Sequence, residues 1–282
     1  MSKIHQAIRR AEQESTWGQP KPDAPKNHLL EKFHAQARSS FSENTMISPP
    51  AQKAAKAVFV DDLSGSWSCR EFPLSSAPQL VALSSSDSAA SRAYQELKRQ
   101  LVRIKQESGF CSFLVTSAEK SEGKSLTAAN LSLALAQEEE GKVLLVDANL
   151  RGAAAHRLLG LTGETGLTDT VRDGLLFKDV VVKAENLGLF FLAAGSPSAN
   201  PVELLNTQRT RNLLASAKAR FDWVIVDAPP VIACPETSFL ASFVDAVILV
   251  VRPRANAAEK VRTGIEILKG YPLAGIVVNE TG

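Results

Sequence analysis

Cysteine is scarce in this chain of 282 residues, and its scarcity narrows the classes of protein to consider. The three cysteines, Cys69, Cys111 and Cys234, are odd in number and form no C-x-x-C pair. They are therefore predicted to be reduced thiols of a cytosolic protein. The four histidines are dispersed along the chain and form no pattern of metal ligands, so no metal cluster is expected.

Long apolar runs and a strong excess of one charge are also missing. No apolar stretch approaches the roughly 18 to 20 residues that a membrane span needs, and the polar N-terminus lacks a signal-peptide core. The net charge of +2 is too balanced to indicate a nucleic-acid partner. A hydrophobic content of 44% allows one large domain, or one domain with appendages. We therefore expect a cytoplasmic protein.

Residues 1–15 and 16–76 are predicted to be appendages of a folded domain at 77–282. Segment 16–76 is rich in proline, serine and lysine and has little periodicity, which predicts a mostly disordered linker. Segment 1–15 is interpreted as a helix that docks on a partner, touches a membrane surface weakly, or stays solvated. Four of its apolar residues share one narrow stripe at helical spacing: Ile4, Ala7, Ile8 and Ala11.

The remainder of the chain alternates strand-like apolar runs with helical segments. This alternation predicts a doubly wound α/β fold with a mostly parallel sheet. Continuous apolar runs are typical of strands that are buried on both faces of such a sheet. Strands are expected at 79–83, 113–116, 142–147, 187–192, 221–227, 246–251 and 274–279. Helices are expected from residue 86, after residue 124, at 157–161, after 166–169, from residue 200 and at 257–268.

The segment Cys111–Leu126 combines a strand, a polar loop, G-K-S and a helix, which is the context of a phosphate-binding P-loop. Backbone N–H groups of such a loop bind phosphate oxygens, Lys124 can reach the β and γ phosphates, and Ser125 can ligate Mg²⁺. Ala118 replaces the first glycine of the usual pattern, a mild departure. A surface turn with a chance lysine is the alternative. The predicted nucleotide-binding residues of the loop are Ser121, Glu122, Gly123, Lys124, Ser125 and Leu126.

Two aspartates end apolar strands and are expected beside this loop. Asp147 and Asp227 follow buried runs, and ligands of open α/β sheets sit at the carboxyl ends of the strands. Asp227 is predicted to hold Mg²⁺ or its water, which leaves Asp147 free to act on the attacking oxygen. The predicted metal-binding residues are Ser125, Asp147 and Asp227. Alternatively, each aspartate caps the helix that follows it.

Four stretches resemble the bacterial tyrosine kinases, a branch of the MinD/ParA-type P-loop ATPases. V-L-L-V-D-A-N-L-R-G at 143–152 resembles their extra acidic motif, and V-I-V-D-A-P-P-V at 224–231 resembles their Walker B strand. A-A-G-S-P-S-A-N-P-V-E-L-L at 193–205 is similar to a stretch that is fairly specific to this branch. I-V-V-N at 276–279 matches their final strand. The opening residues are also similar to soluble members associated with exopolysaccharide export.

The resemblance, which covers roughly residues 79 to 282, implies an ATP-dependent protein-tyrosine kinase that serves exopolysaccharide or capsule synthesis or export. It implies ATP and Mg²⁺ as cofactors, and catalytic roles for Lys124, Asp147 and Arg151. Asp147 would accept the tyrosine hydroxyl proton, and Asn279 would read adenine. The implied partner is a membrane-embedded polysaccharide co-polymerase that acts as activator on a separate chain. Recruitment to the inner face of the plasma membrane is left open.

Two departures from the family pattern concern catalysis. Asn149 occupies the position of the second aspartate of the acidic motif, and an amide cannot supply the negative charge that Mg²⁺ favours. The family's C-terminal tyrosine cluster is also missing, since the only tyrosines are Tyr94 and Tyr271. Weakened catalysis is therefore expected, and a non-catalytic ATP-binding regulator of polysaccharide export is an open alternative.

Further departures concern assembly and the alternative family branch. Relatives build a ring through E-x-x-R-x-x-R, whereas the matching positions here hold Arg92, Gln95 and Lys98. The Glu–Arg pairing is absent, so the resemblance leaves the formation of a homo-oligomer open. Positioning ATPases of the ParA/MinD type carry a signature lysine where this chain has Glu119. That alternative function is therefore disfavoured.

Overall fold

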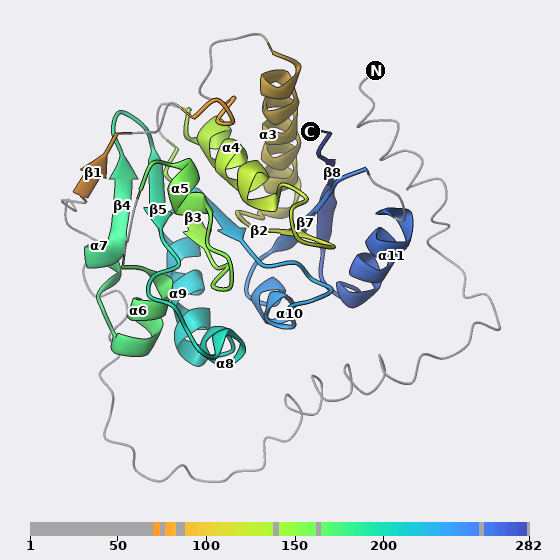
Figure 1. The fold of residues 1–282 in the computed structure, drawn as a ribbon. Helices are drawn as coiled ribbons and strands as arrows, with labels where there is room; N and C mark the ends of the chain where they lie inside the picture. Colours follow the sequence, from red (N-terminus) through yellow and green to blue (C-terminus); the bar gives the residue numbers. More distant parts are fainter. Residues whose placement is uncertain are drawn as a thin grey trace, which may run out of the picture. The chain divides into compact units, whose positions relative to one another are not determined.

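The computed structural model describes residues 70–73, 77–82, 88–137, 141–161, 165–253 and 257–280. The predicted helix at 1–15 and most of the predicted linker lie outside these residues. Within the described part, one sheet is covered by helices on both faces (Figure 1). None of the helices described is long and apolar enough to cross a membrane.

The sheet has eight strands in the part of the chain that is described. They are β1 (Arg70–Phe72), β2 (Ser112–Ser117), β3 (Val143–Asp147), β4 (Val181–Ala184), β5 (Leu189–Leu192), β6 (Trp223–Asp227), β7 (Ala246–Val251) and β8 (Leu273–Val278). Their order is β1-β4-β5-β3-β6-β2-β7-β8, and of these pairs only β4–β5 is antiparallel. The predicted doubly wound, mostly parallel α/β fold is confirmed.

The helices of the described residues connect these strands. They are α3 (Ala89–Ser108), α4 (Lys124–Ala136), α5 (Ala155–Leu158), α6 (Leu167–Asp173), α7 (Phe177–Val180), α8 (Pro201–Leu205), α9 (Gln208–Lys218), α10 (Glu236–Ala241) and α11 (Ala257–Ile267). The longest begins at an N-cap serine, Ser88, whose hydroxyl accepts a hydrogen bond from the Ser91 N–H at 3.1 Å. It ends at Gly109, which has φ 73 and can take this left-handed conformation without a steric penalty.

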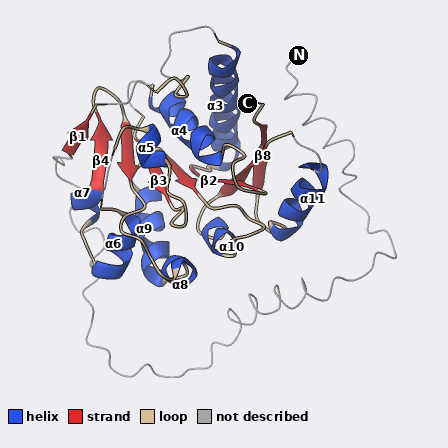
Figure 2. Cartoon of the chain, viewed as in Figure 1, coloured by secondary structure: helices blue, strands red, loops and turns tan. Residues whose placement is uncertain are grey.

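Two apolar clusters pack on opposite faces of the sheet. The central strands β2, β3, β6 and β7 are buried along their whole length, as their continuous apolar runs predicted. Because successive side chains of a strand point to opposite faces, Phe113 and Leu145 pack in the cluster that includes α3 and α4. Leu114 and Leu144 pack in the cluster that includes α9 and α10. The strands therefore form a middle layer between helices (Figure 2).

The predicted strand at 79–83 is wrong for its described residues, because 79–82 form turns. The Asn130 side chain, from inside α4, supplies partners that a neighbouring strand would otherwise supply. Its Oδ1 accepts from the Ala82 N–H at 3.0 Å, and its Nδ2 donates to the Gln79 carbonyl at 3.0 Å. These bonds hold the segment against the helix rather than in the sheet.

The edge strand β1 corrects the predicted boundary between linker and domain. Residues 70–72 lie within the segment predicted to be disordered, yet they pair in parallel with β4. That prediction is wrong for these three residues, and the folded domain begins before residue 77. A three-residue strand contains only one apolar side chain, Phe72, that is buried in the core, so the sequence gives little periodicity from which to predict it.

Candidate functional site

Three neighbouring strands bring the predicted site residues to one edge of the sheet. In the order β3-β6-β2, the strands run parallel, and their carboxyl ends lie side by side. Asp147 and Asp227 are register partners at the ends of β3 and β6, and the loop at 118–123 follows β2. The two aspartates therefore lie beside the loop, where the strand pattern placed them.

The loop bends sharply before α4 begins. Gly123 precedes the helix with φ 93, and a Cβ atom there would lie 1.8 Å from Asn279 Nδ2. Only glycine fits this position without displacing its neighbour. Ser121 also adopts a left-handed conformation, with φ 62, which is uncommon for a residue other than glycine. The first N–H groups of α4 have no partner within the helix, so this bend presents them to an anion.

Two predicted nucleotide-binding residues hold the loop in shape. The Glu122 carboxylate is buried and accepts hydrogen bonds from the backbone N–H groups of Glu119 at 2.8 Å and Arg252 at 3.5 Å. Asn279 donates from Nδ2 to the Glu122 carbonyl at 3.0 Å. The structure therefore gives Glu122 and Asn279 a contact with the loop itself, and the adenine-reading role of Asn279 stays a prediction.

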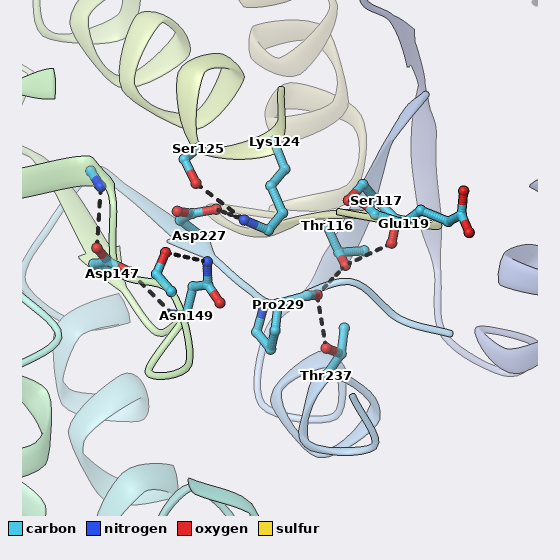
Figure 3. Close-up of polar contacts among 12 residues, drawn as sticks. Thr116, Ser117, Glu119, Lys124, Ser125, Asp147, Asn149, Asp227, Pro229 and Thr237 are labelled. Carbon is cyan, nitrogen blue, oxygen red and sulfur yellow. Dashed lines mark hydrogen bonds and ion pairs between the residues drawn. The ribbon is translucent and has the colours of Figure 1, made fainter. Parts of the chain in front are cut away.

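Lys124 and Ser125 face the end of β6 (Figure 3). Lys124 Nζ donates to the Ser125 hydroxyl at 3.2 Å and lies 3.9 Å from Asp227 Oδ1. Asp227 is completely buried, and neither of its carboxylate oxygens accepts a hydrogen bond of ordinary geometry from a residue that the structure describes. Burial raises the pKa of Asp227 to about 6, although the Lys124 charge and the Ser125 hydroxyl act in the opposite direction.

Asp147 is the second buried carboxylate of the site. Burial and the negative charge of Asp227 raise its pKa to about 7. Its Oδ1 accepts from the Asn149 N–H at 3.1 Å, and its Oδ2 accepts from the Ala155 N–H, at the start of α5, at 3.3 Å. The alternative helix-capping role is therefore partly realised, because one oxygen contacts the following helix.

The donor set of this site fits Mg²⁺. Asp227 and Asp147 offer hard carboxylate oxygens, the Ser125 hydroxyl lies near Asp227, and neither oxygen of Asp227 accepts a hydrogen bond of ordinary geometry from a described residue. In the described residues no three His, Cys, Asp or Glu side chains are grouped to hold a metal by themselves. A magnesium ion here would therefore take its remaining ligands from phosphate and water, as is usual for this ion.

The turn after β3 carries the remaining residues of the acidic motif. Asn149 donates from Nδ2 to the Gly152 carbonyl at 2.9 Å, and the Gly152 N–H donates back to the Asn149 carbonyl at 3.0 Å. Arg151, within this turn, donates from Nε to Glu236 Oε1 at 2.6 Å. The sequence interpretation missed Glu236. Its acidic side chain soon after the Walker B strand was the signal that could have identified it.

Comparison with known proteins identifies the family. A model of the ParA family, described as NUBPL iron-transfer P-loop NTPase, matches residues 111–282. Tyrosine-protein kinase YwqD of Bacillus subtilis is 30% identical over 201 residues, which cover 70% of this chain and 84% of YwqD. The chain belongs to the bacterial tyrosine-kinase family. The resemblance seen in the sequence motifs is thus confirmed.

A solved kinase domain agrees with this chain in fold, and a relative named as a putative tyrosine-protein kinase is much longer than this chain. The kinase domain of Escherichia coli tyrosine kinase ETK superposes with a TM-score of 0.68 at 26% identity, covering 78% of this chain and 84% of that domain. AmsA of Erwinia amylovora is 29% identical over 203 residues, which are 71% of this chain but 28% of AmsA. The chain therefore spans just over a quarter of AmsA. As a P-loop NTPase of this family, it is a nucleotide-binding protein.

Proposed function

We propose that this chain binds ATP with Mg²⁺ and transfers the γ-phosphoryl group to tyrosine in a pathway of polysaccharide synthesis or export. The observation that carries the proposal is the buried Asp227 carboxylate, whose oxygens accept no hydrogen bond of ordinary geometry among the described residues and which lies 3.9 Å from the P-loop Lys124 and opposite Asp147. The polysaccharide role is supported by the similarity of the opening residues to soluble members associated with exopolysaccharide export.

Each residue of the site has a role in this proposal. Lys124 and the first N–H groups of α4 bind the phosphates, and Ser125 and Asp227 hold Mg²⁺. Bound Mg²⁺ would neutralise charge on the β and γ phosphates. Asp147 accepts the proton of the tyrosine hydroxyl. Its pKa, raised to about 7, suits a general base, because the best catalytic pKa lies near the working pH.

The acceptor tyrosine is proposed to lie on a second protein. Tyr94 is partly buried and packs against the core. Burial raises its pKa, although hydrogen bonds with Thr127 and Asn130 act in the opposite direction. Tyr271 is also partly buried in the apolar cluster of its face, and burial raises its pKa. Neither tyrosine side chain is fully exposed to solvent, as an acceptor of a phosphoryl group would need to be. The proposed activator is likewise a separate, membrane-embedded chain at the inner face of the plasma membrane.

A non-catalytic regulator is the second candidate. Asn149 favours it, because its amide is committed to the Gly152 carbonyl and contributes no negative charge to the metal site. A positioning ATPase is less well supported. Glu119, at the place of the signature lysine, forms an ion pair with Lys260 of α11 instead.

The experiment that separates these functions is incubation of the purified full chain with γ-labelled ATP and Mg²⁺. It is run alone and with the candidate membrane activator encoded nearest to it, which also serves as a source of tyrosine acceptors. Labelled phosphotyrosine supports the kinase. Free phosphate without phosphotyrosine supports the positioning ATPase, and bound but unreacted ATP supports the regulator.

A further inference from the structure

Arg151 contacts a buried acid that none of the motifs above contains. Glu236 is the first residue of α10, and its side chain is 1% exposed, whereas the Arg151 side chain is 46% exposed. Arg151 Nε donates to Glu236 Oε1 at 2.6 Å. The second oxygen, Glu236 Oε2, is buried and has no hydrogen-bond partner among the described residues. One half-exposed arginine thus satisfies half of a buried carboxylate.

The ion pair of Arg151 and Glu236 is expected to contribute little to the stability of the fold. Burying a carboxylate removes its hydration, and the loss is repaid only when the remaining lone pairs are also satisfied. The lone pairs of Glu236 Oε2 accept no hydrogen bond from a described residue. Water also screens the charge of the half-exposed Arg151, which weakens its attraction to Glu236. A role in placing the guanidinium explains the arrangement better than a role in holding the fold together.

Both members of the pair lie on segments that border the proposed nucleotide site. Next to Glu236, the Thr237 hydroxyl donates to the Pro229 carbonyl at 2.9 Å, and the Thr116 hydroxyl of β2 donates to the same carbonyl at 2.7 Å (Figure 3). The start of α10 is therefore tied to β2 and to the segment after Asp227. On the other side, the turn that carries Arg151 is closed by Asn149 and follows Asp147 directly.

The pair lies close to the P-loop. Cys234, two residues before Glu236, has a pKa raised by burial and by Glu236, and three positive charges act in the opposite direction: Arg151, Lys120 and Lys124. The backbone places the turn of Arg151 in the same region, because this turn follows Asp147, whose register partner Asp227 lies 3.9 Å from Lys124. Lys124 is the lysine of the G-K-S motif, so the turn lies at the phosphate end of the site.

We infer that Glu236 is a positioning residue that holds the Arg151 guanidinium toward the γ-phosphate. This inference rests on the proposed function. The bond engages Nε, so the two terminal nitrogens remain as donors for a phosphate oxygen. Glu236 itself touches no phosphate. It fixes the direction in which Arg151 points.

The test compares the affinities of a non-hydrolysable ATP analogue and of ADP, each with Mg²⁺, by calorimetry on the full chain. We expect Arg151→Ala to lower analogue affinity by about tenfold or more, as for a hydrogen bond to a charged group, while ADP affinity changes little. Glu236→Gln keeps the shape, removes the charge, and should cause most of the same loss. Because the two residues act as one unit, the double variant should bind no worse than Arg151→Ala alone.

A matched control is the exposed pair on α3, where Arg103 Nε donates to Glu107 Oε1 at 2.7 Å. Arg103→Lys should change neither affinity. Arg151→Lys keeps the charge but lacks the guanidinium fork, so its affinity for the ATP analogue should fall while its ADP affinity changes little. This variant keeps the inference testable if Glu236→Gln fails to fold. The inference would be overturned if Arg151→Lys or Glu236→Gln bound the ATP analogue as tightly as the wild type. It would also be overturned if the losses of analogue affinity were additive in the double variant. A wild-type chain that binds neither nucleotide would overturn the proposed function together with it.

Discussion

At the scale of single residues, Asp227 and Asp147 are costly groups to bury together. They are register partners at the ends of β6 and β3, both are completely buried, and each has a raised pKa. Two negative charges so close in a medium of low dielectric repel each other, and Lys124 offsets only part of this cost. The arrangement is understandable if the site is built for the cation that accompanies a nucleotide.

Asp227→Asn should therefore stabilise the nucleotide-free chain at neutral and alkaline pH. A carboxyl whose folded pKa lies above its ordinary 3.8 stabilises the fold at low pH, and that contribution is lost as pH rises through about 6. Replacing it by a neutral amide should raise the free energy of unfolding at pH 8 by at least about 1 kcal/mol, or a few degrees in Tm. The check is thermal unfolding between pH 5 and pH 8. An equal or lower Tm for the variant at pH 8 would contradict this account.

Asn149→Asp should raise phosphotyrosine formation, because it restores the second carboxylate of the acidic motif. It should also cost about 1 kcal/mol of stability, since the amide donor to the Gly152 carbonyl is lost. Asn149→Ala is the matched control, because it loses the same bond without adding charge. Rates are compared with labelled ATP, Mg²⁺ and a good tyrosine acceptor. Equal rates for the two variants would show that the missing charge does not limit catalysis.

At the scale of elements, the sequence predicted those with long, uninterrupted patterns. The runs at β2, β3, β6 and β7 are buried on both faces, so their apolar character was unbroken. The strands β1 and β4 were missed because three and four residues show few alternations, and the helices α7 and α10 were missed because four and six residues make less than two helical turns. The turn at 79–82 was mistaken for a strand, since its hydrogen bonds come from Asn130, which is distant in the sequence.

The same limits apply to the candidate site. That Lys124, Ser125, Asp147 and Asp227 lie at one edge of the sheet was predictable, because a motif or a strand end marks each of them. The contact of Asn279 with Glu122 could not be derived from sequence, since these two residues are 157 positions apart. The role of Glu236 could not be predicted for a similar reason, because its partner Arg151 lies 85 positions away in the sequence.

The edge strand β1 changes the expected result of limited proteolysis. The linker composition of residues 16 to 69 still predicts cleavage in that segment. Pairing of Arg70–Phe72 with β4 predicts a resistant core that begins at or before residue 70, and not near residue 78, just past the predicted start of the domain at residue 77. N-terminal sequencing of the stable fragment checks this. A core that begins at residue 78 with unchanged Tm would show that β1 contributes nothing to the domain.

At the scale of the whole molecule, the fold places three strand ends of one sheet around a single loop. The site depends on residues from β2 to β8, because Asn279 holds the P-loop and α10 holds the turn after β3 through Arg151. Family membership and the ETK kinase-domain fold agree with this arrangement. The central claim is that Mg²⁺ and ATP bind together at the site that includes Lys124 and Asp227.

The most direct test of that claim is calorimetric titration of the full chain with ATP, with and without Mg²⁺. We expect Mg²⁺ to strengthen binding and Lys124→Ala to weaken Mg-ATP binding by about 2 kcal/mol or more, as for a charge-assisted contact with phosphate. Lys183→Ala, in the exposed pair with Glu71 at the far edge of the sheet, is the control and should leave the affinity unchanged. Equal Mg-ATP affinity for wild type and Lys124→Ala, or affinity that is the same with and without Mg²⁺, would contradict the account.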